Sequence, residues 1–221
     1  MSRTRIKICC ISSPEEARLA VEHGADAIGL VGPMPSGPGV IDDRLIAEIA
    51  QAVPPPVATF LLTSETSPDA IIAHARACGT NTVQLVDHVA PSDYPVLRAG
   101  LPGIRLVQVI HVEGPSSIDD AKTMGHLADA LLLDSGRVSL QVKELGGTGR
   151  THDWSLSREI VRVSPCPVFL AGGLKPENVG QAIREVRPYG LDLCTGVRTE
   201  NRLDAEKLRR FVESVANADA V

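Results

Sequence analysis

Aromatic side chains are scarce in this sequence. They make up 3% of its 221 residues, although hydrophobic residues as a whole reach 43%. The core must therefore consist mainly of Val, Leu, Ile and Ala, which suit parallel strands that are buried on both faces. Charged residues make up 22%, an ordinary balance for a globular chain that buries a sizeable core.

Clusters of lysine and arginine are also missing, and the formal net charge is −5. We therefore expect no nucleic-acid partner, because proteins that bind nucleic acid carry a basic patch. No apolar run approaches the roughly 20 residues that span a bilayer, so we expect no membrane association. The N-terminal segment MSRTRIKICC has basic residues but no apolar stretch behind them, unlike a signal peptide.

Cysteines are few, odd in number and without C-x-x-C spacing. This pattern argues against a disulfide framework or a zinc site and favours a reducing cytoplasm. The five cysteines are Cys9, Cys10, Cys78, Cys166 and Cys194.

Short β-like apolar runs alternate with longer helical ones along the whole chain. Such alternation predicts parallel strands joined by right-handed helical crossovers. We count eight units of about 28 residues, enough for a closed (β/α)8 TIM barrel forming a single α/β domain over residues 1–221, with a frayed tail at 217–221. A doubly wound open sheet is less favoured, because no glycine-rich fingerprint follows the first strand. The strands are expected at 6–10, 27–31, 57–62, 82–85, 105–110, 130–133, 168–170 and 191–194.

Three glycine-bearing loops follow the last three expected strands, at 146–149, 171–174 and 195–197. Glycine lets backbone N–H groups approach an anion without a Cβ in the way, and phosphate sites in these barrels commonly follow strands 7 and 8. The alternative is that the glycines only form tight turns. We favour a phosphate site that comprises Gly172, Gly173, Thr195, Gly196 and Val197.

Two residues at strand ends, Cys9 and Asp134, are candidates for a functional role. Strand alternation puts Lys7 and Cys9 on one face and Cys10 on the other. From composition alone, a buried structural cysteine is the favoured interpretation of Cys9. Asp134 ends the apolar run 130–133, and no helix is expected to begin before about Ser155, so it is no simple N-cap. We expect its carboxylate at the barrel mouth, because an unpaired charge in the core is costly.

With these residues in place, the sequence resembles the phosphoribosylanthranilate isomerase family over nearly its whole length. The matching motifs include Lys7-Ile8-Cys9, Val83-Gln84-Leu85, residues 132–135, the stretch 146–149 that leads to Asp153-Trp154, the block 170–179, and Gly196-Val197.

The resemblance implies a TIM barrel that performs an Amadori rearrangement in tryptophan biosynthesis on a phosphorylated sugar. It implies no metal ion, no organic cofactor and no obligate protein partner. In such a reaction Asp134 would protonate the furanose ring oxygen, and Cys9 would remove the C2′ proton of the resulting imine. Lys7 would supply positive charge beside the thiolate. The other substrate-binding residues that the resemblance implies are Gln84 and Gly147.

Departures from the family pattern gather around the expected site for the anthranilate carboxylate. Cys10 replaces the usual glycine, and Pro38 stands where the family has an arginine that pairs with this carboxylate. Val86-Asp87 replaces the usual His-Gly. Arg198 replaces an acid at the rim and is our candidate for the missing carboxylate contact, with a solvated charge or a salt-bridge partner as the alternative.

Two other functions stay open at this point. The loss of the arginine at Pro38 would also suit a related barrel isomerase that acts on a different phosphorylated sugar. A non-catalytic protein that binds a phosphate ligand is a third possibility, but such a protein gains nothing from keeping both Cys9 and Asp134.

Overall fold

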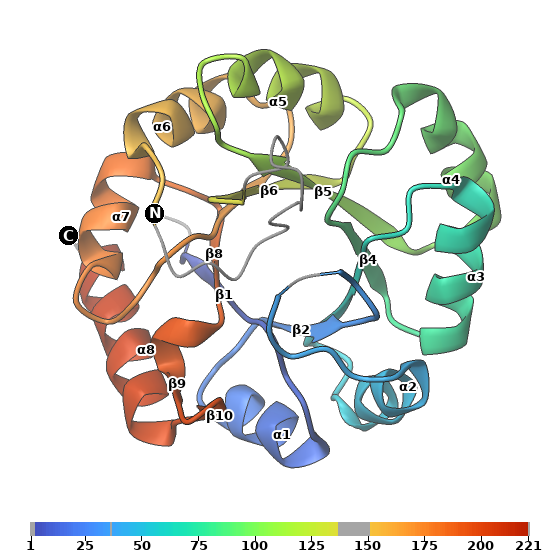
Figure 1. Cartoon of the computed structure of the whole chain (residues 1–221). Helices are drawn as coiled ribbons and strands as arrows, with labels where there is room; N and C mark the ends of the chain where they lie inside the picture. Colours follow the sequence, from blue (N-terminus) through green and yellow to red (C-terminus); the bar gives the residue numbers. More distant parts are fainter. Residues whose placement is uncertain (1–2, 36, 137–150, 221) are drawn as a thin grey trace.

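The computed structural model describes residues 3–35, 37–136 and 151–220 and forms a closed barrel of parallel strands in the order β1 to β8. Figure 1 looks into the barrel, with the helices in a ring around it. The strands are β1 (Arg5–Ile8), β2 (Ala27–Val31), β3 (Ala58–Thr63), β4 (Thr82–Leu85), β5 (Arg105–His111), β6 (Ala130–Asp134), β7 (Val168–Leu170) and β8 (Gly190–Leu193).

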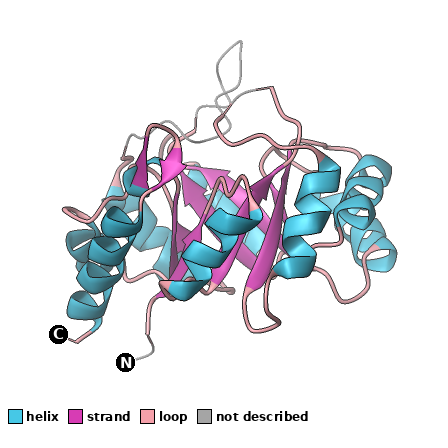
Figure 2. Ribbon diagram, turned by 90° about the horizontal axis from the view of Figure 1, so that it is seen from below, coloured by secondary structure: helices cyan, strands magenta, loops and turns pink. Residues whose placement is uncertain are grey.

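The helices cover the outside of the barrel, as the side view in Figure 2 shows. They are α1 (Pro14–Glu22), α2 (Asp43–Ala52), α3 (Pro68–Cys78), α4 (Tyr94–Gly100), α5 (Ser117–Gly125), α6 (Trp154–Val163), α7 (Val179–Val186) and α8 (Ala205–Asp219). The described residues also form two 3-10 turns, η1 (Pro91–Asp93) and η2 (Thr195–Val197), and a small hairpin of β9 (Arg198–Thr199) and β10 (Arg202–Leu203). The predicted TIM barrel is therefore confirmed.

Short polar side chains start most of these helices. The Ser13 hydroxyl accepts a hydrogen bond from the Glu16 N–H at 3.2 Å, with Pro14 at the first helical position of α1. Asp42 caps α2 in the same way. Such caps satisfy N–H donors that the first helical turn leaves free, and so they stabilise the start of the helix.

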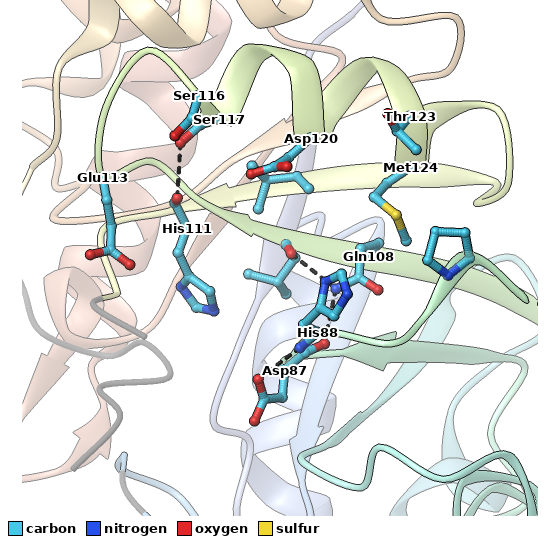
Figure 3. Close-up of a pocket in the computed structure, with 13 residues that line it drawn as sticks. Asp87, His88, Gln108, His111, Glu113, Ser116, Ser117, Asp120, Thr123 and Met124 are labelled. Carbon is cyan, nitrogen blue, oxygen red and sulfur yellow. Dashed lines mark hydrogen bonds between the residues drawn. The ribbon is translucent and has the colours of Figure 1, made fainter. Parts of the chain in front are cut away.

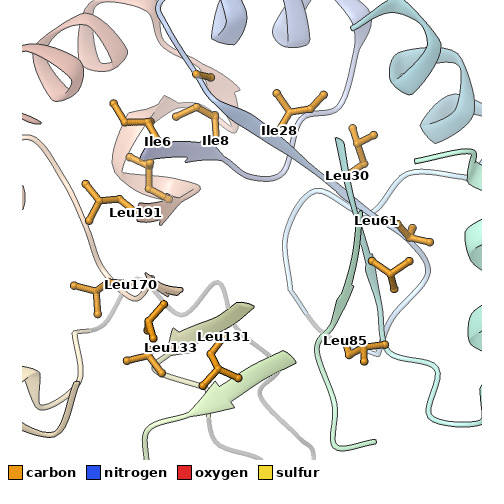
Figure 4. Close-up of a cluster of buried hydrophobic side chains, with 14 of the residues drawn as sticks. Ile6, Ile8, Ile28, Leu30, Leu61, Leu85, Leu131, Leu133, Leu170 and Leu191 are labelled. Carbon is orange, nitrogen blue, oxygen red and sulfur yellow. The ribbon is translucent and has the colours of Figure 1, made fainter. Parts of the chain in front are cut away.

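Apolar side chains form one layer between strands and helices and another inside the barrel. Ile8, Ile28 and Leu30 belong to the outer layer, which Figure 4 shows. Phe60 and Phe169 contact each other edge-on in the inner layer, with ring centroids 6.1 Å apart. With so few aromatic residues, the interior is filled mainly by aliphatic side chains, as the composition predicts.

Two sequence-based details are wrong. The first strand ends at Ile8 rather than residue 10, because Cys10 has a left-handed backbone with φ of 61°. At the other end, α8 continues to Asp219, although we expected a frayed tail from 217. The Asp219 carboxylate accepts hydrogen bonds from the Thr4 N–H and hydroxyl at 2.8 and 2.5 Å, and these bonds hold the last turn. Among the described helices, none is long and apolar enough to cross a membrane.

Candidate active site

A lysine–aspartate ion pair lies inside the barrel, close to its C-terminal mouth. Lys7 is fully buried, and its Nζ donates a hydrogen bond to Oδ1 of Asp192 at 2.8 Å. Lys7 Nζ also lies 5.1 Å from the centroid of the Phe60 ring. Burial alone would lower the pKa of Lys7, but attraction to Asp192 and Cys9 and the hydrogen bond to Asp192 raise it, so the side chain stays protonated.

Cys9 lies next to this ammonium group. A Cβ built on Gly29 would be 2.7 Å from Cys9 Sγ and 3.0 Å from Lys7 Nζ, so both atoms occupy the space that a side chain on Gly29 would fill. Cys9 itself is buried, at 6% exposure. The shared face that strand alternation predicts for Lys7 and Cys9 is therefore present.

Asp134 ends β6 at the same mouth, and its carboxyl pKa is raised. Burial is the largest cause, and the negative charge of Asp192 adds to it. The Ser135 N–H, which donates to Asp134 Oδ1 at 2.7 Å, and the charges of His111 and Lys7 oppose this shift. Lys7 and Asp192 therefore lie close enough for their charges to act on the carboxyl group of Asp134.

His111 is a neighbour of this acid that the sequence interpretation missed. It pairs with Asp134 across the ladder of β5 and β6, and its Nε2 lies 2.9 Å from the Val86 carbonyl oxygen. Its other ring nitrogen is buried without a hydrogen-bond partner in the described part of the chain. Its position directly after the apolar run 105–110 could have identified His111 as a candidate from the sequence.

A cavity of about 520 Å³ opens beside His111 (Figure 3). It lies between the segment after β4, the strand β5 and the helix α5. The charged and histidine side chains that line it are Asp87, His88, His111, Glu113 and Asp120. Since His111 belongs both to this cavity and to the surroundings of Asp134, the cavity adjoins the candidate acid.

Cys10 corrects the alternation argument. It does not point away from Cys9 but packs with it in the inner cluster, because its left-handed backbone breaks the strand pattern. Its thiol is hydrogen-bonded with Cys194, which raises the pKa of Cys10 and lowers that of Cys194. A hydrogen bond with Cys9 and burial add to the shift of Cys10, and the charge of Arg198 adds to that of Cys194. Three cysteines thus meet where β1 and β8 end.

The loops after β7 and β8 come together at one corner of the mouth. Gly172 and Gly173 have positive φ values of 86° and 62°. A Cβ on Gly196 would be 2.0 Å from the Leu174 carbonyl oxygen, so only glycine allows the two loops to lie this close. Among the described residues, the backbone N–H groups of Gly172, Gly173 and Gly196 form no hydrogen bond. Thr195 and Val197 belong to the short turn η2 beside them.

Gln84 and Gly147 are two further predicted substrate contacts. Gln84 lies inside the barrel near the end of β4, since its strand neighbours Val83 and Leu85 both pack in the outer layer. It is 3% exposed, and its Oε1 has no hydrogen-bond partner in residues 3–35, 37–136 and 151–220. Gly147, with the whole loop 146–149, lies outside the described residues.

Arg198 is placed differently from the expected free carboxylate-binding arginine. Its side chain is 8% exposed, and its guanidinium donates to both carboxylate oxygens of Glu16, at 2.8 and 3.1 Å. It also donates to the carbonyl oxygens of Cys9 and Cys10, at 3.3 and 2.6 Å. The geometry thus supports the alternative of a salt-bridge partner, one that holds the backbone at Cys9. Pro38 is exposed in the loop after β2.

Comparison with known proteins identifies the family of this barrel. The family model described as N-(5'phosphoribosyl)anthranilate (PRA) isomerase matches residues 6–214, almost the whole barrel. The chain belongs to the phosphoribosylanthranilate isomerase family. This membership makes it an isomerase of tryptophan biosynthesis, and it does not favour either alternative function.

Relatives of the family resemble the chain from end to end. An N-(5'-phosphoribosyl)anthranilate isomerase from Methanocella arvoryzae is 37% identical over 96% of this chain and 98% of its own. One from Methanosarcina mazei is 39% identical over 96% and 94%. Among solved structures, the phosphoribosyl anthranilate isomerase of Thermotoga maritima has a TM-score of 0.82 at 28% identity, covering 97% of this chain and 99% of that one.

A further family structure contains a ligand. It is a phosphoribosyl anthranilate isomerase in complex with reduced 1-(o-carboxyphenylamino)-1-deoxyribulose 5-phosphate, with a TM-score of 0.80 and 26% identity over 97% of this chain and 99% of that one. The family therefore includes a barrel of this shape that binds a phosphorylated analogue.

Proposed function

We propose that the chain converts N-(5-phosphoribosyl)anthranilate to 1-(2-carboxyphenylamino)-1-deoxyribulose 5-phosphate, with Asp134 as general acid and Cys9 as general base. The observation that carries this assignment is the raised pKa of Asp134 at the same mouth as the adjacent Lys7 and Cys9 side chains. A carboxyl group that keeps its proton to higher pH is better suited to donate it near neutrality.

The first step uses Asp134. Its proton passes to the furanose ring oxygen while the C1′–O bond breaks and the lone pair of the anthranilate nitrogen forms the C1′=N bond of a protonated imine. The carboxylate that remains is favoured by the nearby positive charge of Lys7.

The second step uses Cys9. Its thiolate removes the proton from C2′, and the electron pair of that C–H bond moves toward the imine to give an enolamine, which tautomerises to the ketose. Lys7 stays protonated beside the thiol, and Asp192 balances its charge. Acid–base transfer of this kind needs no cofactor.

The phosphate group would bind at the amides of Gly172, Gly173 and Gly196, with Thr195 and Val197 completing the turn. Free N–H groups in a concave loop are suited to hold an anion. Lys7 and Gln84 would contact the sugar, and the buried, unpaired Oε1 of Gln84 supports an acceptor role for it. Gly147 stays a proposed contact from the family motif.

The phosphorylated sugar is the partner that this proposal requires. A cytoplasmic location is also part of the proposal, supported by five cysteines that are all unpaired.

The test is the activity of the purified chain on N-(5-phosphoribosyl)anthranilate, followed by the loss of anthranilate fluorescence. We expect turnover by the wild type and by Cys166→Ala, and a loss of about 10²–10⁴-fold in kcat for Cys9→Ala and Asp134→Asn. A wild type without turnover would contradict the substrate assignment. Full kcat in either variant would contradict the assignment of that residue.

A further inference from the structure

A second group of chemically reactive side chains lies outside the barrel, between α2 and α3. These helices lie side by side on the ring in Figure 1. Asp43 is the first residue of α2, and His74 and Cys78 lie four residues apart on α3, on one face of the helix. One oxygen, one nitrogen and one sulfur atom from these residues all lie within 4.8 Å of one another.

The ring of His74 is fixed from both sides. Its Nδ1 lies 2.9 Å from Thr63 Oγ1, and its Nε2 lies 3.1 Å from Asp43 Oδ1. Metal-binding histidines in proteins are held in the same way, with one ring nitrogen on an outer group and the other directed at the ion. Thr63 is itself fully buried and has the Glu65 N–H as a second partner, at 3.2 Å.

A glycine makes the space for this ring. A Cβ on Gly32 would lie 2.5 Å from Cε1 and 2.7 Å from Nε2 of His74. The site also has a path to solvent, since the Asp43 side chain is 43% exposed, whereas that of His74 is 10% exposed and Cys78 is fully buried.

We propose that Asp43, His74 and Cys78 bind a divalent transition metal ion such as Zn²⁺, with water as the fourth ligand. Carboxylate, imidazole and thiolate are the ligand types that zinc accepts, and their two negative charges balance the ion. Donor atoms around tetrahedral zinc lie about 3.3–3.6 Å apart, so a small movement of Cys78 closes the site. On binding, the Cys78 S–H bond breaks, its proton leaves to solvent, and a sulfur–metal bond forms.

Without a metal ion, hydrogen bonds among the three residues would also account for their arrangement. The His74 Nε2–H and the Cys78 S–H would then both donate to the Asp43 carboxylate. This arrangement would bind no ion at low concentration, so the two cases make opposite predictions. The site is unrelated to the catalytic residues, and its occupation would tie α2 to α3.

Cobalt(II) is the probe that distinguishes them, because a cobalt–thiolate bond absorbs in the near ultraviolet and tetrahedral cobalt absorbs in the visible. We expect the full chain to show both bands at one equivalent of Co²⁺, and Zn²⁺ to displace them. Cys78→Ser should abolish the near-ultraviolet band, while Cys166→Ser, at a part-buried cysteine elsewhere, should keep it.

Loss of the outer contact in Thr63→Val should weaken Co²⁺ binding about 10–100-fold. Asp43→Asn tests the site at a half-exposed residue, where folding is least at risk, and should weaken binding at least as much. Unchanged bands in Cys78→Ser would overturn the proposal, because another thiol would then hold the ion. A wild type that gives no band with a tenfold excess of Co²⁺ would overturn it too.

Discussion

Lys7 and Asp192 are paired in the register of the sheet, and their side chains also form an ion pair. They stand opposite each other in the register of β1 and β8, and Lys7 Nζ donates to Asp192 Oδ1 at 2.8 Å. A buried ion pair therefore joins the first and last strands where the barrel closes. The same pair sets the charge around Cys9 and Asp134.

Lys7→Met should destabilise the protein by about 3–5 kcal/mol, because it leaves the carboxylate of Asp192 buried without its partner. The double variant Lys7→Met/Asp192→Leu should recover most of this stability, since no buried charge remains, but no activity. Urea denaturation of the three proteins measures the difference. A double variant as unstable as the single one would show that the ion pair is not the cause.

Asp134→Asn should stabilise the protein at pH 7 while it lowers kcat. The folded-state pKa of Asp134 is raised above its ordinary value of 3.8, so stability is lost as pH rises through the folded-state pKa. Asparagine lacks this ionisation. The difference in Tm between variant and wild type should therefore grow from pH 4 to pH 7, as thermal unfolding across pH measures. A constant difference would contradict a raised pKa.

Cys10→Gly should fold and retain activity, whereas Cys10→Val should be less stable than both the wild type and Cys10→Gly. At φ of 61° a β-branched side chain is strained and glycine is not. The free energy of unfolding and kcat of the three proteins provide the test. Equal stability of the valine and glycine variants would mean that the backbone at this position relaxes.

Arg198→Ala should cost about 3–5 kcal/mol of stability, because Glu16, with a side chain 13% exposed, loses its charged partner and keeps only the hydrogen bonds from Ser12 and Leu203. We also expect kcat to fall, since the guanidinium holds the carbonyl groups of Cys9 and Cys10. Arg198→Lys should recover only part of both losses, as lysine lacks the two-pronged geometry. An increase in KM alone, with kcat and stability unchanged, would instead support a contact with the anthranilate carboxylate.

Gly173→Val should raise KM for the phosphorylated substrate more than it lowers kcat. Gly173 has a φ of 62°, and a side chain there would also obstruct the approach of an anion to the backbone. Steady-state kinetics, with inorganic phosphate as a competing inhibitor, measure this effect. Unchanged phosphate affinity in a folded variant would place the anion site elsewhere.

The fold is predictable from the sequence because each unit carries its own local signals. Ser13-Pro14 marks the start of a helix, and the apolar run 130–133 marks a strand, without reference to distant residues. Consecutive strands that are joined by helices usually pair with each other, so the strand order follows from the order of the units in the sequence.

The site is less predictable because its contacts join distant parts of the chain. Arg198 meets Glu16 across 182 residues, and only the closed barrel brings them together. Asp192 was overlooked for the same reason, although an acid within the apolar run 191–194 was a usable signal. Cys10 fails the alternation argument because its left-handed backbone ends the strand early, which a period of two cannot indicate.

The hydrogen bonds between Thr4 and Asp219 make the chain suitable for circular permutation. They bring the two ends of the described chain within contact of each other. A short linker would therefore join the ends without strain, and new ends could be opened in an exposed turn such as the one around Gly103. In a ring of units that each pair with their neighbours, the closed barrel does not require that the chain begin at β1.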